Sequence, residues 1–235
     1  MFTRTLKRLL LTASMCCLVA TANAAPFDDA FAAHDRGDYA QALKIFRQLA
    51  TKGNAVAQAM IGAMYRDGEG VTQNYQEALK WYRLAAAQGN AVAQFNLGWM
   101  YRNGQGVTQD DKEAGKWYRL AAAQGYDNAQ YNLGVMYRRG EGVTQDDKEA
   151  LKWYRLAAAQ GYASAQFNLG TMYDTGQGVP QDYAKAHMWY NLAGSTGDAD
   201  GAKNRDLIAK EMTPQQIEKA QDMARKCQER NLKGC

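Results

Sequence analysis

A 36-residue repeat occurs four times in succession and constrains the fold more than any other feature of the chain. The blocks follow one another without insertion or deletion, over residues 54–89, 90–125, 126–161 and 162–197. A fixed period of this length is typical of stacked structural units, each of which buries its apolar face against its neighbours. We therefore expect one repeat domain over 54–197.

Each block has the pattern of two helices joined by a glycine turn. In the second block an apolar stripe recurs at four-residue steps, at Ala93, Leu97 and Tyr101. A second stripe with i, i+3, i+4, i+7 spacing consists of Ala114, Trp117, Tyr118 and Ala121. Between the stripes stands Gly-x-Gly-Val, whose glycines allow backbone angles that other residues resist. We expect the valine to hold this turn against the core.

The ends of the second helix are marked in the sequence. Asn74, Asp110 and Asp146 are predicted N-caps, each with a glutamate three residues on, which is a variant of the capping box. The fourth block keeps Asp182 but has Lys185 in the glutamate position. The Trp-Tyr pair that recurs in every block is predicted to be core, and His187 is expected at a helix surface.

These residues carry a resemblance to a known family. The pattern A-x-x-x-LG-x-x-Y-x-x-G-x-G-V-x-x-D-x-x-x-A-x-x-W-Y-x-x-A-A-x-x-G resembles the Sel1-like repeat, a relative of the tetratricopeptide repeat. The resemblance implies an all-α, right-handed α-solenoid of stacked antiparallel helix pairs, which binds other proteins and has no catalysis or cofactor of its own. Residues 25–53 are expected to form an N-terminal capping helix pair or a half-repeat, and residues 198–235 are expected to be C-terminal capping helices.

The resemblance also implies where a partner binds, because tetratricopeptide relatives use the concave face lined by their first helices. The positions carried over include an aromatic line, a cationic line and one tryptophan. They are Phe95, Tyr131, Phe167, Arg66, Arg102, Arg138, Arg139 and Trp99. Two interpretations stay open for the aromatic line, which either contacts a partner or packs between repeats, and the arginines are either contacts or solvated charges. Trp99 is the strongest single candidate, since its position varies among the blocks.

The N-terminal segment has the features of a secretory signal peptide over residues 1–24. Basic residues precede an uncharged apolar run that is too short to span a bilayer, and Ala22-Asn23-Ala24 is a small-x-small cleavage site. Removing its three basic residues from the 28 of the whole chain leaves 25 against 24 acidic residues. The mature chain is therefore nearly neutral, which argues against a nucleic-acid partner. We expect a periplasmic protein without a transmembrane segment, with full secretion as the alternative and a monomer as the simplest state.

The mature chain keeps two cysteines, Cys227 and Cys235, close together near its C-terminal end. In an oxidising compartment a nearby pair is expected to form a disulfide. Two free thiols on a frayed tail are the alternative.

Residues for catalysis or metal binding are scarce and scattered. The two histidines, His34 and His187, lie far apart, so the sequence predicts no metal site. Neither Ser164 nor Ser195 begins the S-x-x-K motif of penicillin-interacting serine enzymes. We expect a non-enzymatic scaffold. Two other functions stay open, which are a cell-envelope hydrolase or β-lactam-binding protein, and a secreted effector or adhesin that engages a host protein.

Overall fold

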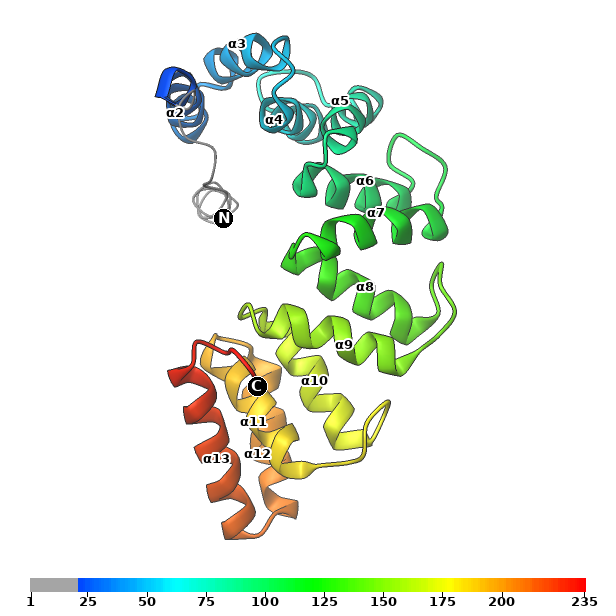
Figure 1. The fold of residues 1–235 in the computed structure, drawn as a ribbon, viewed down its shortest axis with the longest axis vertical. Helices are drawn as coiled ribbons and strands as arrows, with labels where there is room; N and C mark the ends of the chain where they lie inside the picture. The colour runs from blue at the N-terminus through cyan, green and yellow to red at the C-terminus, as the bar shows by residue number, and fades with distance from the viewer. Residues whose placement is uncertain (1–20) are drawn as a thin grey trace. The chain divides into compact units, whose positions relative to one another are not determined.

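The computed structural model describes residues 21–235, and side chains from residue 26 onward. The signal peptide predicted over residues 1–24 therefore lies almost entirely outside the described residues and stays a prediction. Across 21–235 every regular element is a helix and no strand occurs. The predicted all-α architecture of paired helices is confirmed (Figure 1). No helix of this part of the chain is both long enough and apolar enough to cross a membrane.

The chain divides into two compact units, which are described separately. The first unit ends at Ala93 and holds two helix pairs. Its helices are α2 (Thr21–Asp35), α3 (Tyr39–Ala50), α4 (Ala55–Asp67) and α5 (Tyr75–Ala87). Buried Ala42, Phe46 and Ala50 of α3 share one core with Ile61 and Met64 of α4. The segment predicted to cap the first full repeat therefore packs against it.

The second unit runs from Gln94 to Cys235 and holds the remaining repeats and the C-terminal helices. Its helices are α6 (Ala91–Asn103), which begins three residues before the unit boundary, α7 (Asp111–Ala123), α8 (Asp127–Arg139), α9 (Asp147–Ala158), α10 (Ala163–Thr175), α11 (Tyr183–Ser195), α12 (Ala199–Ile208), the short 3₁₀ helix η1 (Ala209–Glu211) and α13 (Pro214–Glu229). Each helix from α7 to α11 packs against the helix that follows it, and α12 and α13 both cover α11.

A glycine in the first helix of each repeat receives the tyrosine of the second helix. The Tyr154 ring lies so close to Gly134 that a Cβ added there would be 2.7 Å from the ring. The same contact recurs in all four repeats, at Gly62–Tyr82, Gly98–Tyr118, Gly134–Tyr154 and Gly170–Tyr190. All four tyrosines are buried. The missing side chain therefore sets how closely the two helices of a pair approach.

The turn between the paired helices uses its two glycines differently. In repeat 3, Gly140 ends α8 with a left-handed φ of 70°. Gly142 lies against the start of the preceding second helix, where a Cβ would be 2.2 Å from the Asp111 carbonyl oxygen. The second glycine is thus required because the backbones of successive repeats touch there.

The predicted N-caps are present, but the capping box is not formed as expected. The Asp110 side chain accepts from the Glu113 amide at 3.0 Å. The Asp110 amide, which the box would pair with Glu113, already donates to the Tyr101 carbonyl at 2.9 Å. Glu113 instead binds Lys116 at 2.7 Å. The first helix of the repeat therefore satisfies the donor that the glutamate would otherwise bind.

Two predictions about burial were wrong in part. The tryptophans of the Trp-Tyr pairs are only half-buried at Trp81, Trp117 and Trp153, and just Trp189 is buried like the tyrosines. His187 is 3% exposed and not at a surface. Both differences have one cause, since α12 and α13 cover α11 and bury the outer face that α7 and α9 leave open.

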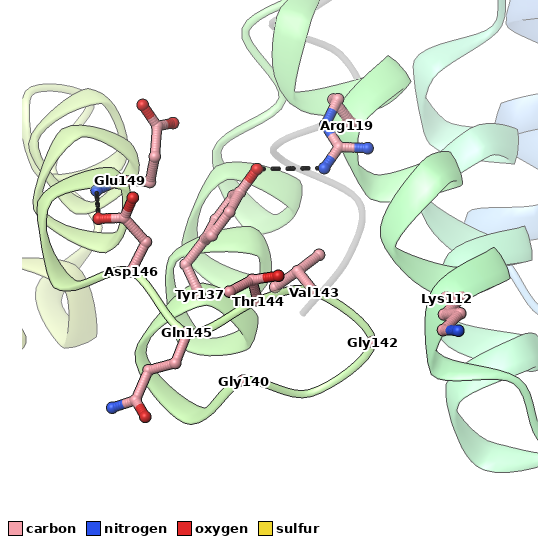
Figure 2. A pocket seen from close by; sticks show the side chains of 10 residues that line it. All are labelled: Lys112, Arg119, Tyr137, Gly140, Gly142, Val143, Thr144, Gln145, Asp146 and Glu149. Carbon is pink, nitrogen blue, oxygen red and sulfur yellow. Dashed lines mark hydrogen bonds between the residues drawn. The ribbon is translucent and has the colours of Figure 1, made fainter.

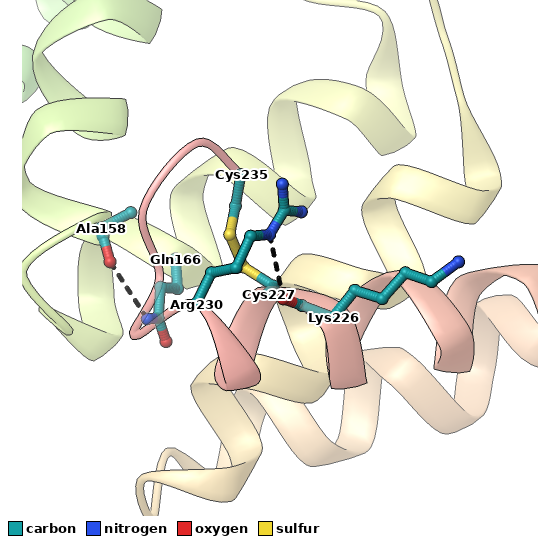
Figure 3. The surroundings of a disulfide bond; sticks show 6 residues. All are labelled: Ala158, Gln166, Lys226, Cys227, Arg230 and Cys235. Atoms are coloured by element: carbon teal, nitrogen blue, oxygen red, sulfur yellow. Dashed lines mark hydrogen bonds between the residues drawn. A yellow bond between two sulfur atoms is a disulfide. The ribbon is translucent and has the colours of Figure 1, made fainter.

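The C-terminal helix α13 begins with a complete capping box, in which Thr213 and Gln216 bind each other's backbone amides and Pro214 occupies the first turn. Figure 3 shows its other end, where a disulfide joins Cys227 to Cys235 with a Cα–Cα distance of 5.7 Å. Leu232 in the closed loop packs against the repeat core. The pair predicted from the sequence is thus bonded in this structure.

In repeats 1 to 3 a glutamine at the end of the second helix donates a hydrogen bond to a glutamine of the first helix, and this series stops at the fourth repeat. Gln124 donates to Gln94 at 2.7 Å, and Gln160 donates to Gln130 at 2.8 Å. The fourth repeat has Thr196 in place of the donor, and the Oε1 atom of buried Gln166 has no partner among the described residues. Gln166 donates instead to the Ala158 carbonyl (Figure 3).

Candidate functional site

The candidate residues of the second unit lie on the first helices of repeats 2 to 4. Phe95, Trp99 and Arg102 belong to α6. Helix α8 carries Tyr131, Arg138 and Arg139, and α10 carries Phe167. All are half-buried except Arg139, which is exposed. Arg66 lies in the first unit, where it binds its neighbour Asp67 at 2.6 Å, so it is not assigned to this surface. We call the remaining residues the first-helix face.

The aromatic line packs within the protein. The Phe95 ring lies 5.6 Å from the Tyr118 ring and 5.1 Å from the Tyr126 ring, measured between centroids. Tyr131 lies 4.9 Å from Tyr162, and Phe167 lies 5.6 Å from Tyr190. Of the two interpretations left open by the sequence, packing is therefore observed. The partial exposure of each ring leaves an edge available to a ligand.

Trp99 differs from the aromatic line because its repeat position holds no other aromatic residue. The equivalent residues are Ala63, Val135 and Thr171. Its ring is half-buried on the same helix as Arg102, three residues earlier, so the two side chains share one face of α6. A partly exposed tryptophan at a variable position is available for contact with another molecule.

The arginines of this face bind other groups of the second unit. Arg102 forms an ion pair with Glu141 at 2.6 Å, and Arg139 approaches the same carboxylate at 3.5 Å. Arg138 donates to the Asn168 side chain at 3.2 Å. The Arg102 and Glu141 side chains are 22% and 33% exposed, so their pair stabilises the fold by no more than about 1 kcal/mol.

The tyrosine hydroxyls beneath this face are satisfied unequally. Tyr190 donates toward Thr171 and Asp174, at 3.3 Å each. The equivalent Tyr118 is fully buried, and its hydroxyl has no hydrogen-bond partner among the described residues. Burial raises the pKa of Tyr190 to about 12 and also raises that of Tyr118, so both hydroxyls stay protonated donors at neutral pH. An unpaired buried hydroxyl costs roughly 1–3 kcal/mol.

An open pocket lies between α7, the end of α8 and the turn that leads to α9 (Figure 2). Three of its four charged lining residues are engaged in the fold, among them Glu149, which binds Lys152 at 3.4 Å. Arg119 donates to the Tyr137 hydroxyl at 3.1 Å, and the Asp146 carboxylate accepts from the Glu149 amide at 3.1 Å. This pocket is therefore built from groups that join successive repeats and cap α9.

Metal-ligating side chains do not gather in the described part of the chain, where no three His, Cys, Asp or Glu residues form a possible site. His34 pairs with Glu69 at 2.8 Å in the first unit, and His187 is buried in the second.

Stacked antiparallel helix pairs with a buried tyrosine on each glycine define an α-helical repeat protein of the tetratricopeptide-like class. The sequence model of the Sel1 repeat matches residues 34–54, 55–90, 91–126, 127–162 and 163–198, and the chain belongs to this family. No curated protein matches the chain.

Solved structures agree with this assignment. A Sel1 repeat protein from Oxalobacter formigenes is 37% identical over 74% of this chain and 72% of its own, with a TM-score of 0.71. The protein c5321, a protective antigen of uropathogenic Escherichia coli, is 31% identical over 80% of this chain, which matches 48% of that protein, with a TM-score of 0.54. A putative Sel1 repeat protein from Klebsiella pneumoniae is 23% identical over 79% of this chain and 92% of its own, with a TM-score of 0.51, and shows the fold alone.

Sequence reasoning missed two groups of the site, Glu141 and the Tyr118 hydroxyl. Glu141 lies in the turn, outside the helix positions carried over from relatives. Tyr118 was assigned to the core, and its ring is indeed buried, but its oxygen is not satisfied. One signal was present, because the repeated arginine becomes Asp174 in the fourth block, where a tyrosine hydroxyl needs an acceptor.

Proposed function

We propose that this chain is a non-enzymatic interaction module of the bacterial cell envelope, which binds a peptide or protein segment on the first-helix face of repeats 2 to 4. Sel1 repeat proteins generally mediate interactions between proteins, which supports the general function. The predicted signal peptide and the Cys227–Cys235 disulfide support a periplasmic location.

We choose the first-helix face as the binding surface because of Trp99. Trp99 is a large, half-buried aromatic residue at a position where the other repeats hold smaller side chains, and it lies beside an arginine on α6. The most energetically important residues of protein interfaces are enriched in tryptophan, tyrosine and arginine. An extended segment lying across α6, α8 and α10 would contact Trp99 first and the edges of the aromatic line next.

The test is a quantitative capture of periplasmic proteins on the purified protein and on two variants. The first combines Trp99→Ala, Arg102→Ala and Arg138→Ala. The matched control combines Leu120→Ala and Leu156→Ala, which removes exposed leucines of the second helices. We expect partners to be lost with the first variant and kept with the second. Equal capture by all three proteins would exclude this face as the binding surface.

The location is tested separately. N-terminal sequencing of the protein recovered from a periplasmic fraction is expected to begin at Ala25, and recovery only from the culture medium would favour the secreted alternative. Hydrolysis of a chromogenic β-lactam above that of the Trp99→Ala variant and a buffer blank would instead favour the enzyme alternative.

A further inference from the structure

The inference concerns the chemistry of the bound segment and rests on the proposed function. In the fourth repeat the protein itself places a carboxylate beside the tyrosine of the second helix. Tyr190 donates to Asp174 Oδ2 and to Thr171 Oγ1 at 3.3 Å each. The carboxylate and the hydroxyl thereby satisfy each other within one repeat.

The second repeat holds the same tyrosine without the carboxylate. The positions of Thr171 and Asp174 are occupied by Trp99 and Arg102. Neither Trp99 nor Arg102 supplies an acceptor, and the buried Tyr118 hydroxyl has no partner in the described residues. Repeat 2 therefore combines the Tyr118 hydroxyl donor with the Arg102 cation, whereas the fourth repeat pairs the equivalent hydroxyl with the Asp174 carboxylate.

Arg102 of repeat 2 already binds a carboxylate, which comes from the neighbouring repeat 3. Glu141, in the turn after α8, binds Arg102 at 2.6 Å. Both side chains remain partly open to solvent, so the pair can be exchanged for another. A displaced Glu141 would retain Arg139, which already lies 3.5 Å from its other oxygen.

We propose that Arg102 and Tyr118 form a carboxylate subsite, in which an Asp or Glu side chain of the bound segment replaces Glu141 on Arg102 and accepts a hydrogen bond from the Tyr118 hydroxyl. Because the Tyr118 oxygen is covered, we expect the carboxylate to reach it only after the Arg102 side chain has left Glu141. Trp99 lies on the same helix face, so the residue next to the acidic one is expected to be aromatic or a large aliphatic. The partner is thus an acidic–apolar segment, and Glu141 competes with it.

The probe is a set of synthetic peptides. Random dodecapeptides are selected by display on the purified protein, and the tightest binder is synthesised with its Asp or Glu and with the matched Asn or Gln. Affinities are measured by titration calorimetry. We expect selection to enrich acidic residues next to apolar ones, and the amide peptide to bind at least about tenfold more weakly.

Three variants identify the subsite. Arg102→Gln should bind the acidic and amide peptides within about threefold of each other, because the cation is gone. Glu141→Gln should bind the acidic peptide more tightly, by about threefold or more, because the internal competitor is neutral. Tyr118→Phe should weaken binding of the acidic peptide, while the protein's thermal unfolding midpoint is unchanged or slightly raised. Tyr190→Phe is the matched control and should leave binding unchanged.

The outcomes separate this inference from the proposed function. Binding that is lost in Trp99→Ala, but shows no acid preference and no response to Glu141→Gln, overturns the carboxylate subsite and leaves the binding surface standing. Binding that ignores Trp99→Ala, or a selection that yields no binder, overturns the proposed surface and the subsite with it.

Discussion

Repeats 2 and 4 are built on the same scaffold but treat the same positions in opposite ways. Tyr118 and Tyr190 are both buried on the glycine of their first helix. In repeat 4 the hydroxyl is paired with side chains of its own repeat, whereas in repeat 2, whose first helix carries Trp99 and Arg102, it has no hydrogen-bond partner among the described residues. The shared scaffold of helices and glycine contacts therefore does not determine whether the tyrosine hydroxyl is paired, which depends on the side chains at two positions of the first helix.

The outer faces of the two repeats differ as well. Leu120 in repeat 2 is 49% exposed, whereas the equivalent Leu192 is 1% exposed under the C-terminal helices. Met188 and His187 replace the lysine and the glycine of repeat 2 at that covered face. The outer face of repeat 4 is therefore covered by the C-terminal helices, whereas the outer face of repeat 2 remains exposed.

The largest effect is expected from variants that disrupt the glycine–tyrosine contact, which repeats 2 and 4 share. Gly98→Ala and Gly170→Ala each place a Cβ inside the contact distance of a tyrosine ring, at 2.7 Å and 2.5 Å. We expect both to lower the free energy of unfolding by about 2–3 kcal/mol in spite of the better helix propensity of alanine. Urea unfolding followed by circular dichroism measures this.

The matched control is Gly115→Ala, in the second helix of repeat 2. Its Cβ would lie 3.2 Å from the flexible end of Met136 and 3.6 Å from Val143 Cγ1, which is an ordinary van der Waals contact. We expect it to be neutral or to stabilise by up to about 1 kcal/mol, from helix propensity alone. If it destabilised as much as Gly98→Ala, the close approach of the tyrosine would not explain the helix glycines.

The next largest effect is expected from loss of the Cys227–Cys235 disulfide at the C-terminal end of the chain described here. Cys235→Ser opens the loop between Cys227 and Cys235, whose sequence separation is 8 residues. Loss of this cross-link is expected to lower the unfolding free energy by roughly 2 kcal/mol, through the entropy of the unfolded chain. The wild type should lose the same stability when reductant is added, and the variant should not respond. A wild type that is indifferent to reductant and shows free thiols in its mass spectrum would contradict the bonded tail.

A smaller effect follows from the buried histidine of repeat 4. Burial, together with the nearby Arg205, lowers the pKa of His187 below its usual 6.5. Below that value the unfolded chain binds a proton that the folded protein excludes. Stability is therefore complete above about pH 6.5 and falls as the pH drops toward the folded pKa, by at most about 1.4 kcal/mol per pH unit. His187→Leu, which copies Leu151, should flatten this part of the pH profile of thermal unfolding. An unchanged profile would show that His187 does not cause it.

The smallest effect is expected from removing the tyrosine hydroxyl, which is paired in repeat 4 and has no partner among the described residues in repeat 2. Tyr190→Phe removes a paired hydroxyl and should cost about 1 kcal/mol. Tyr118→Phe removes an unpaired one and should be neutral or slightly stabilising. The two variants differ by one oxygen each at equivalent positions, so their unfolding midpoints can be compared directly. Equal losses would mean that Tyr118 has a partner in solution.

Much of the fold was predictable because the same local sequence patterns occur in each of the four repeats. The paired helices, the N-caps at Asp110 and Asp146, and the buried tyrosines all follow from local patterns. The position of His187 did not, because its burial depends on helices α12 and α13, which lie outside the repeat pattern. Glu141 could not be assigned for a similar reason, since its partner Arg102 lies 39 residues earlier in the chain.

We propose that the first-helix face of repeat 2 contacts the partner and that the outer face does not. A photo-crosslinking phenylalanine derivative, placed in cells at position 99 or at position 120, tests this directly. We expect a covalent adduct with a partner from position 99 and none from position 120, which lies on the exposed side of α7. Adducts from position 120 alone would contradict it and assign binding to the second helices.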